Sequence, residues 1–534
     1  MRELLRFILC GFLLLTAREG IAQDSQLVPE QITLLDAVRS AITRHPALHT
    51  EEQQLQISRA LRQQASSVFD DVLAGGLNQS HLNSPLTKYQ QSEALASGIQ
   101  TTNLFSNLTD LNFGSTKLLR DGITFGPTFD VGRTTDNLTN APGVNSSHLG
   151  LQITLPLLRG RGREVVTSQE NAAGIEIDAT LLDLRQTVAT LIANAASSYW
   201  SYVAAQKSLA VAMGSEQRGR QFLDNVQSLI DADQSPRSDI RNVEANLADR
   251  QATRILAQEN ALEARQALAL NMGLGADSVS EQLSTLDEFP EPAAGFVPAD
   301  DPAKLKRYRD EALNRRFDLQ AADKRVVEAK VLSKASFNLL KPQLDLTFST
   351  GYSGLAEGTQ ASRYLYSPFT GVQGLDAVAG VVYQFPHANS LAKGKVAQAT
   401  ALLRQAEIHS QDLSRTVASS VTTSYSSLRN AVLRLEKARK SVAEFQAALE
   451  GEHEKLTLGI GSVVDILTVE DRLTTALQGE VQAQMSYAVA LVTFRYATGT
   501  FFNGSDPSIT IQKQDLTTFP FSNGTAAETS ADKR

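Results

Sequence analysis

One stretch of this chain is repeated further along it without a gap. Adding 226 to each residue number aligns residues 199–273 with residues 425–499, and both stretches begin with tyrosine and end with glycine. Residues 239–247 read Asp-Ile-x-x-Val-Glu-x-x-Leu, and residues 465–473 read the same. A second match, at an offset of 271, pairs Leu34, Ala41, Arg44, Leu48 and Leu61 with Leu305, Ala312, Arg315, Leu319 and Leu332. Each half is therefore expected to be one structural module, with the two modules packed side by side.

The first residues predict an export signal. Arg2 and Arg6 precede a short apolar run at 7–15, and small residues flank Ile21, so cleavage is expected after Ala22. The run is shorter than the roughly 20 residues of a membrane helix, so a retained anchor is the less favoured interpretation. The single cysteine, Cys10, lies in this segment. The exported chain is thus expected to use neither disulfides nor thiol chemistry.

Composition favours long helices over a series of compact domains. Only 16 of the 534 residues are proline, and the net charge of -8 argues against nucleic acid as a partner. After the export signal, no stretch approaches 18 consecutive apolar residues. Any membrane-spanning part would therefore have to be built from strands.

Four segments are expected to form strands, two in each half. Residues 123–132 and 149–157 alternate strictly between apolar and other residues, and 343–352 and 376–385 take the same place in the second half. The alternating side chains face either lipid or the core of a soluble sheet, and lipid is favoured because the sequence offers no other sizeable core. They are Phe125, Phe129, Leu151, Ile153 and Leu155. The first half has excess residues, mostly between Ser80 and His148, which form either an extra hairpin or a large loop.

Helical patterns fill the rest of each half. A first helix is expected at about 33–66, and a very long run at about 164–233 ends in a break at 231–236, where Ser235 before Pro236 predicts a new helix start. A similar break at 459–462 is followed by Ser462-x-x-Asp465, which resembles a capping box. The expected units are a signal at 1–22, a first repeat at 23–273 (helix, strands at about 68–158, helical hairpin at 164–272), a Pro-rich linker at 274–303, a second repeat at 304–499 (strands at about 343–386, hairpin at about 391–498) and a polar, loosely ordered tail at 500–534.

About four strands cannot enclose a pore on their own, since single-chain membrane barrels begin at eight. An open sheet edge in lipid would leave backbone groups unpaired at a cost of several kcal/mol each. If the strands span a membrane, several chains must share one barrel, and three chains would supply about 12 strands. The long helices carry charged residues throughout, so they must lie in water.

This pattern resembles the TolC-type outer-membrane efflux family. The matching residues are Ala41-x-x-x-His45-Pro46-x-Leu48, the run Pro-Leu-Leu-Arg-Gly-Arg-Gly-Arg at 156–163, Tyr199 and Tyr425, and Gly459-x-Gly461-Ser462-x-x-Asp465. The resemblance implies an α+β membrane protein: a homotrimer with a 12-stranded barrel in outer-membrane lipid and an α-helical barrel across the periplasm. It implies an exit duct for tripartite pumps or type I secretion, whose partners are a periplasmic adaptor and an inner-membrane transporter. One departure is that the first break lacks glycine.

The resemblance also places candidate sites. Asp231, Asp233 and Asp465 would lie at the periplasmic constriction, where the first two form a charged ring around the axis or remain ordinary loop acids. The adaptor-contact tips would comprise Ser235, Pro236, Gly459, Gly461 and Ser462. The basic residues Arg159, Arg161 and Arg163 lie either near inner-leaflet phosphates or in a plain flexible junction.

The sequence is compatible with two other functions. A soluble periplasmic coiled-coil structural or adaptor protein would share the helices but not the barrel. An exported enzyme is disfavoured, because the chain has no P-loop, no Gly-x-Ser-x-Gly and no dinucleotide motif, and its seven histidines are scattered. No catalytic residue, metal site or cofactor is predicted.

Overall fold

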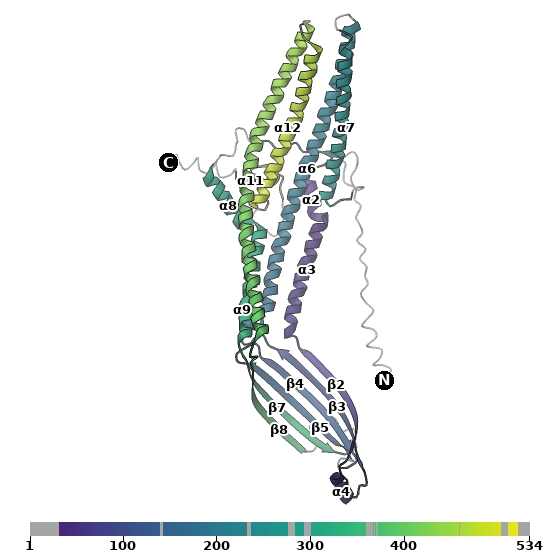
Figure 1. Ribbon diagram of the computed structural model, residues 1–534, viewed down its shortest axis with the longest axis vertical. Coiled ribbons are helices and arrows are strands. Elements are labelled where there is room, and N and C mark those ends of the chain that lie inside the picture. The colour runs from purple at the N-terminus through teal and green to yellow at the C-terminus, as the bar shows by residue number, and fades with distance from the viewer. Residues whose placement is uncertain are drawn as a thin grey trace.

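The computed structural model describes residues 31–138, 142–231, 236–275, 283–292, 301–358, 367, 369, 372–458, 460–502 and 511–521. The predicted export signal, Asp233, Ser235 and Gly459 lie outside these ranges. The molecule is long and narrow, with a β-sheet at one end and two helical hairpins reaching the other (Figure 1).

Each half opens with a broken helix, where the sequence pattern had predicted one helix at about 33–66. In the first half α2 (Leu34–Arg44) and α3 (Pro46–Ser66) are separated by His45, whose ψ of 127° is extended. Proline excludes helical backbone from the residue before it, which explains the break. In the second half α8 (Pro302–Arg315) and α9 (Phe317–Ser336) break at Arg316, the equivalent position by the offset of 271. Short 3-10 turns, η1 (Ser67–Phe69) and η3 (Phe337–Leu340), lead from α3 and α9 toward the sheet.

One antiparallel sheet joins the two halves, in the order β2-β3-β4-β5-β7-β8. Its strands are β2 (Val72–Pro85), β3 (Asn103–Leu118), β4 (Thr124–Asp136), β5 (Val144–Pro156), β7 (Gln343–Glu357) and β8 (Val372–Gln384). The four predicted segments are confirmed as β4, β5, β7 and β8. The estimate of about four strands was nevertheless too low, because six strands lie in the described sheet.

The excess in the first half is a hairpin, formed by β3 and β4, since the offset of 271 places β2 on β7 and leaves these two strands without a counterpart. β2 and β3 pair along their length and are joined through a short helix, α4 (Lys88–Ala96). Their sequences hide the strand period. In β3 the apolar residues Leu104 and Phe105 are adjacent and so point to opposite faces, while β2 is rich in glycine, asparagine and serine.

Long helices form the rest of the body. They are α5 (Arg163–Val166), α6 (Ser168–Asp231), α7 (Asp239–Asn271), α11 (Ser390–Thr457) and α12 (Val463–Thr498). The 64 residues of α6 correspond to about 96 Å at 1.5 Å per residue. Among the helices that the structure describes, none has the length and apolar character needed to cross a bilayer.

The helix ends follow the expected chemistry with one correction. Gly273 after α7 and Gly499 after α12 have φ values of +75° and +67°, the left-handed conformation that glycine adopts at helix C-termini. The helix after the first break begins at Asp239 and not at Pro236. The Asp239 amide donates to the Pro236 carbonyl at 3.1 Å, so a turn separates the proline from the helix.

The linker and the tail contribute to the packed middle of the molecule. In the linker, Leu283 and Phe289 are buried, and β6 (Ser284–Thr285) pairs in parallel with β1 (Gln31–Ile32). In the tail, α13 (Gln514–Thr517) buries Leu516. These described parts are therefore packed, because a few apolar side chains anchor each one.

Two hydrophobic cores lie where these segments meet the long helices. The first surrounds Tyr199 and Trp200, both fully buried, and includes Phe289 of the linker. The second surrounds Tyr425 and Phe494, with Tyr308 of α8 stacked against Phe521 of the tail at 4.5 Å between ring centres. Trp200 therefore serves packing in the first core. A third cluster joins the hairpins nearer their tips and includes Val226, Val243 and Ile466.

Candidate functional site

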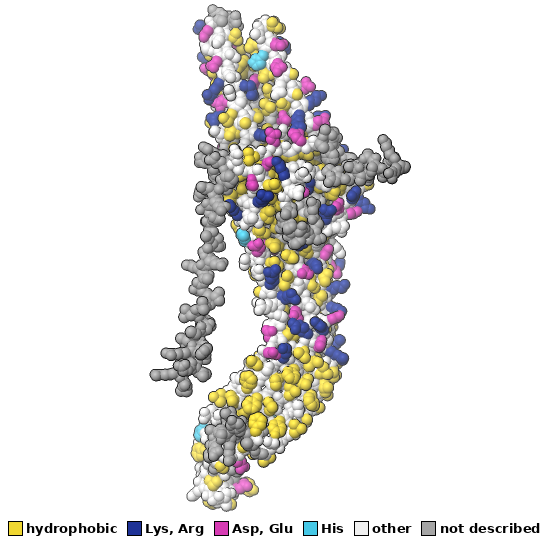
Figure 2. All heavy atoms as spheres, turned by 180° about the vertical axis from the view of Figure 1, so that it is seen from behind, with side chains coloured by type: hydrophobic (Ala, Val, Ile, Leu, Met, Phe, Trp, Pro, Cys, Tyr) yellow, Lys and Arg dark blue, Asp and Glu magenta, His cyan; other side chains and the backbone are white. Residues whose placement is uncertain are grey.

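One face of the sheet is apolar across all six strands. Residues paired directly across an antiparallel sheet share a face, and the pairing runs through Phe113, Phe129, Leu149, Tyr352 and Leu375 on five strands. On the sixth strand, β2, Leu73 and Leu77 lie on the same face. The side chains of Phe113, Leu149 and Leu375 are 53%, 55% and 80% exposed. Figure 2 shows that hydrophobic side chains cover this end of the molecule. A patch of this extent needs an apolar cover.

The alternating residues singled out from the sequence belong to this face. Phe125 pairs with Ile153 and Phe129 with Leu149, and Leu151 and Leu155 follow at intervals of two along β5. The five residues that the sequence pattern predicts to share a face therefore do share one in the structure.

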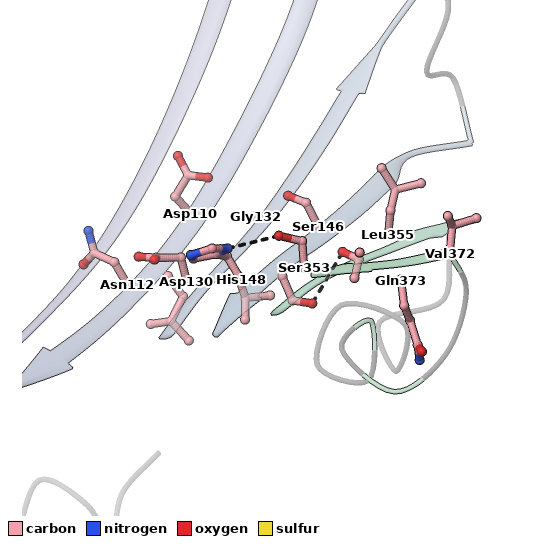
Figure 3. Close-up of a pocket in the computed structure, with 15 residues that line it drawn as sticks. Asp110, Asn112, Asp130, Gly132, Ser146, His148, Ser353, Leu355, Val372 and Gln373 are labelled. Carbon is pink, nitrogen blue, oxygen red and sulfur yellow. Dashed lines mark hydrogen bonds between the residues drawn. The ribbon is translucent and has the colours of Figure 1, made fainter. Parts of the chain in front are cut away.

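The opposite face is polar and hollowed (Figure 3). A pocket on it is lined by Asp110, Asp130, Ser146, His148 and Ser353, among others. The Nδ1 atom of His148 lies 3.1 Å from Oγ of Ser353, whose hydroxyl lies 3.3 Å from Oδ1 of Asp376. A nucleophilic triad needs histidine between serine and carboxylate, whereas serine lies in the middle here, so the cluster does not have that arrangement. It gives this face of the sheet a polar, acidic character.

The junction between sheet and helices is a hydrogen-bonded turn. Gly160 and Gly162 have φ values of +79° and +97°, and their amides donate to Oδ1 of Asn338 at 2.7 Å and to the carbonyl of Asp121 at 3.4 Å. Of the predicted basic residues, Arg159 donates to Gln343, while Arg161 and Arg163 are exposed. Figure 2 shows charged side chains beginning where the apolar surface of the sheet ends.

The hairpin tips are only partly described. Asp231 is the last residue of α6, is exposed, and accepts a hydrogen bond from Nε2 of Gln227 at 2.9 Å. Pro236 is also exposed, in the turn before α7. Within the described residues, nothing brings the predicted tip acids Asp231 and Asp465 into contact with each other.

At the second tip Ser462 caps α12 by accepting from the Val464 amide at 3.1 Å. The predicted capping box is not formed among the described contacts, since the Ser462 hydroxyl accepts from Val464 and not from Asp465, and the Asp465 amide donates to the Ser462 carbonyl at 3.2 Å. The charge of Asp465 instead adds to that of Glu452 in raising the pKa of Lys455. Gly461 packs closely on the end of α11, where a Cβ atom would lie 2.6 Å from the Leu456 nitrogen.

Sequence reasoning missed a buried charge cluster between the hairpins. Glu470 of α12 is 6% exposed and accepts from Nε of Arg218 on α6 at 3.1 Å and from Nη1 of Arg250 on α7 at 3.3 Å. Arg250 is equally buried and also bonds to Asp471 at 3.1 Å. The cluster ties three helices together. The only sequence signal was that Glu470 lies in the duplicated block. Within the described residues, no group of three His, Cys, Asp or Glu side chains is placed to hold a metal ion.

Comparison with known proteins gives one consistent result. The family model described as outer membrane efflux protein matches residues 122–274 and 308–500. The outer membrane protein TolC of Escherichia coli (strain K12) is 25% identical over 376 residues, which is 68% of this chain and 71% of TolC. The CmeC outer membrane channel of Campylobacter jejuni has a similar fold, with a TM-score of 0.63 and 14% identity over 89% of this chain and 87% of CmeC. The MtrE channel of Neisseria gonorrhoeae gives 0.60 and 16% over 87% and 88%.

Proposed function

The chain belongs to the outer membrane efflux protein family, and from this premise we propose that it is the passive, trimeric exit duct of a tripartite efflux pump or a type I secretion system. Proteins of this family are transport ducts of the outer membrane that extend into the periplasm. The finer claims concern how this chain encloses a passage, what it conducts and which partners it contacts.

The two-faced sheet carries the proposal. Its apolar face is exposed along all six strands, and outer-membrane lipid would cover it. Its polar face, with Asp130 and His148, would line a water-filled passage. In water alone the apolar face would have no cover, which disfavours the soluble coiled-coil alternative.

The helices would continue this passage through the periplasm. They carry charged side chains along their length (Figure 2), as aqueous helices do. Cargo would be small molecules or exported substrates. Since the sequence lacks a nucleotide-binding motif, an inner-membrane transporter would supply the energy. A periplasmic adaptor would contact the tips through Pro236, Gly461 and Ser462, together with Ser235 and Gly459, which lie outside the described residues.

Charged residues at the membrane edge and at the helical tips would contribute to the function of the duct. Arg161 and Arg163, exposed at the edge of the apolar surface, would lie near inner-leaflet phosphates, with Arg159 bound inward to Gln343. At the far end Asp231 and Asp465, with the undescribed Asp233, would line the constriction and favour cations over anions. Planar-bilayer conductance of Asp231→Ala and Asp233→Ala tests this ring, since reduced cation selectivity is expected and unchanged selectivity would make both residues ordinary loop acids.

The membrane assignment is tested with two adjacent residues on opposite faces. Ile153→Arg would put a charge against lipid, at about 2–4 kcal/mol per chain near the bilayer midplane, and we expect little assembled protein in the outer membrane. Gln152→Arg puts the same charge on the polar face and should assemble normally. Membrane fractionation followed by native gel electrophoresis measures both. Equal assembly of the two variants would remove Ile153 from lipid and contradict the proposal.

A further inference from the structure

The sheet contains two strands more than the family match covers. The matched ranges, which begin at 122 and at 308, include β4, β5, β7 and β8, whereas β2 and β3 lie before the first of them. By the offset of 271, β2 is the counterpart of β7, so the hairpin that the second half lacks is β3 and β4. This hairpin is a full part of the wall, because β3 pairs with β2 from Val72 with Thr116 to Pro85 with Asn103, and β4 pairs with both β3 and β5. Leu77 lies opposite Leu111 on the apolar face and is 73% exposed.

The two edges of the sheet are matched to each other. Within the residues that the structure describes, neither the outer edge of β2 nor that of β8 pairs with another strand. The edges have 14 and 13 residues. Because every neighbouring pair in the sheet is antiparallel, β2 and β8 run in opposite directions. An edge exposed to lipid would leave its backbone groups unpaired, so each edge needs a partner strand.

We propose that β2 of each copy pairs with β8 of the next, so that each chain contributes six strands and three copies enclose a barrel of 18. The inference rests on the proposed trimer but departs from the 12 strands that the family resemblance implies. The occupant of each edge is a second copy of this chain. Two identical edges would not serve, because a two-fold contact of β2 with β2 would either place the helices of the two copies at opposite ends of the barrel or turn one apolar face inward.

The pairing within one chain predicts the register between chains. One row of directly paired residues crosses the whole sheet through Ala74, Gly114, Thr128, Gly150, Gly351 and Asp376. Ala74 is two residues from the helix-side end of β2 at Val72, and Asp376 is eight residues from the helix-side end of β8 at Gln384. The row therefore shifts by six residues along the strands per chain.

This shift gives an independent check on closure. Six residues at about 3.3 Å over six strands spaced at about 4.8 Å correspond to a strand tilt of about 35°, within the range of closed barrels. If the helix-side ends of all strands lie at one depth, Ala74 of one copy lies opposite Val382 of the next. Both residues then face the polar interior, and Leu73 and Tyr383 face lipid. Because this register pairs residues of the same face, the apolar faces of the two neighbouring copies lie on the same side of the barrel wall.

The additional strands would widen the outer end of the duct. Barrel diameter grows roughly linearly with strand number, so 18 strands give a bore about 1.5 times that of 12. The membrane end would then not limit the size of the cargo, and selection by size would fall to the helical tips.

Disulfide cross-linking in native membranes tests the edge pairing. The variant Ala74→Cys with Val382→Cys is made in a Cys10→Ser background and treated with a mild oxidant or a short thiol cross-linker. We expect a ladder up to the trimer on a non-reducing gel. The two positions lie on opposite edges of one sheet, roughly 20 Å or more apart, so a link within one chain is excluded. A ladder from Ala74→Cys with Gly380→Cys or Gln384→Cys would support the same edge pairing in a register moved by two residues.

A second pair represents closure by four strands. If β3 and β4 stayed outside the wall, β2 would pair directly with β5, so Ala74→Cys with Thr154→Cys would form a disulfide within one chain, whereas two strands separate these positions in the described sheet. That intrachain disulfide, or no ladder from any pair of Ala74 with β8 while the protein runs as a trimer on a native gel, would overturn the inference. A monomer on the native gel would contradict the proposed trimeric duct itself, so the two failures are distinguishable.

Discussion

The two halves of the chain repeat one sequence pattern in different surroundings. Tyr199 and Tyr425 are equivalent by the offset of 226, and each is buried in the middle of a long helix. His45 and Arg316 are equivalent by the offset of 271, and each breaks a helix. At these positions, which are set by the local helix and by a hydrophobic core, the two halves have the same structure.

The duplicated block behaves differently in the two hairpins. Glu470 is buried between Arg218 and Arg250, while its copy Glu244 is exposed. The residues equivalent to those two arginines are Glu444 and Ala476. No matching pair of cations is thus available to Glu244, and the repeat has preserved the acid without its surroundings. Glu470 therefore contributes to the contact between the hairpins, whereas its copy in the first hairpin is exposed.

The largest difference between the copies is expected on removing each acid. Glu470→Ala leaves the buried Arg250 with only the exposed carboxylate of Asp471 as a charge partner, which costs up to about 3–5 kcal/mol, whereas Glu244→Ala should stay within about 0.5 kcal/mol. Thermal or denaturant unfolding of the detergent-solubilised protein, followed by circular dichroism, measures both. Removing Arg250 as well should cost less than the sum of the single changes. Equal losses for the two glutamates would mean that the cluster does not hold the hairpins together.

A smaller difference is expected at the tips. Gly461→Ala pushes a Cβ atom against the Leu456 backbone, and overpacking of this kind costs about 1–3 kcal/mol. Gly451→Ala is the control within the same hairpin. It lies inside α11 with nothing within 4 Å of the new Cβ, so it should stabilise the helix by about 0.5–1 kcal/mol. The described part of the first tip, 236–238, has no glycine. Changes of opposite sign in the unfolding free energies of the two variants would support close packing in the second turn, and changes of equal sign would argue against it.

The smallest effect concerns Glu328 on α9, where the first half has Ile57. Burial, reinforced by the nearby charge of Glu176, raises the pKa of Glu328 to about 7. The protonated form of Glu328 is therefore favoured in the folded state. The stabilisation of the fold that results is complete below the ordinary pKa of 4.5 and is lost as pH rises through about 7. Relative to Glu328→Gln, the melting temperature of the wild type should fall between pH 5 and 8 by no more than roughly 2–4 °C. Parallel melting curves at all pH values would show that Glu328 ionises normally.

Local rules explain what could be predicted at the sheet. β4 and β5 were found because each places apolar residues at alternate positions, so one strand alone reveals its face. β3 was missed because Leu104 and Phe105 interrupt that period, and β2 because few of its residues are apolar. Both belong to the sheet through pairing with neighbours, which no local pattern records.

The sequence by itself determined the twofold repeat, the helix break before Pro46, the glycine ends of α7 and α12 and the apolar face of β4 and β5. Each follows from steric or periodic rules that act within a few residues. Only the tertiary structure decided that six strands form the sheet, that Glu470 and not Glu244 is buried, and that His148 meets Ser353, 205 residues away. The physical reason is that these outcomes depend on hydrogen-bond and charge partners supplied by distant segments, which come together only when the chain folds.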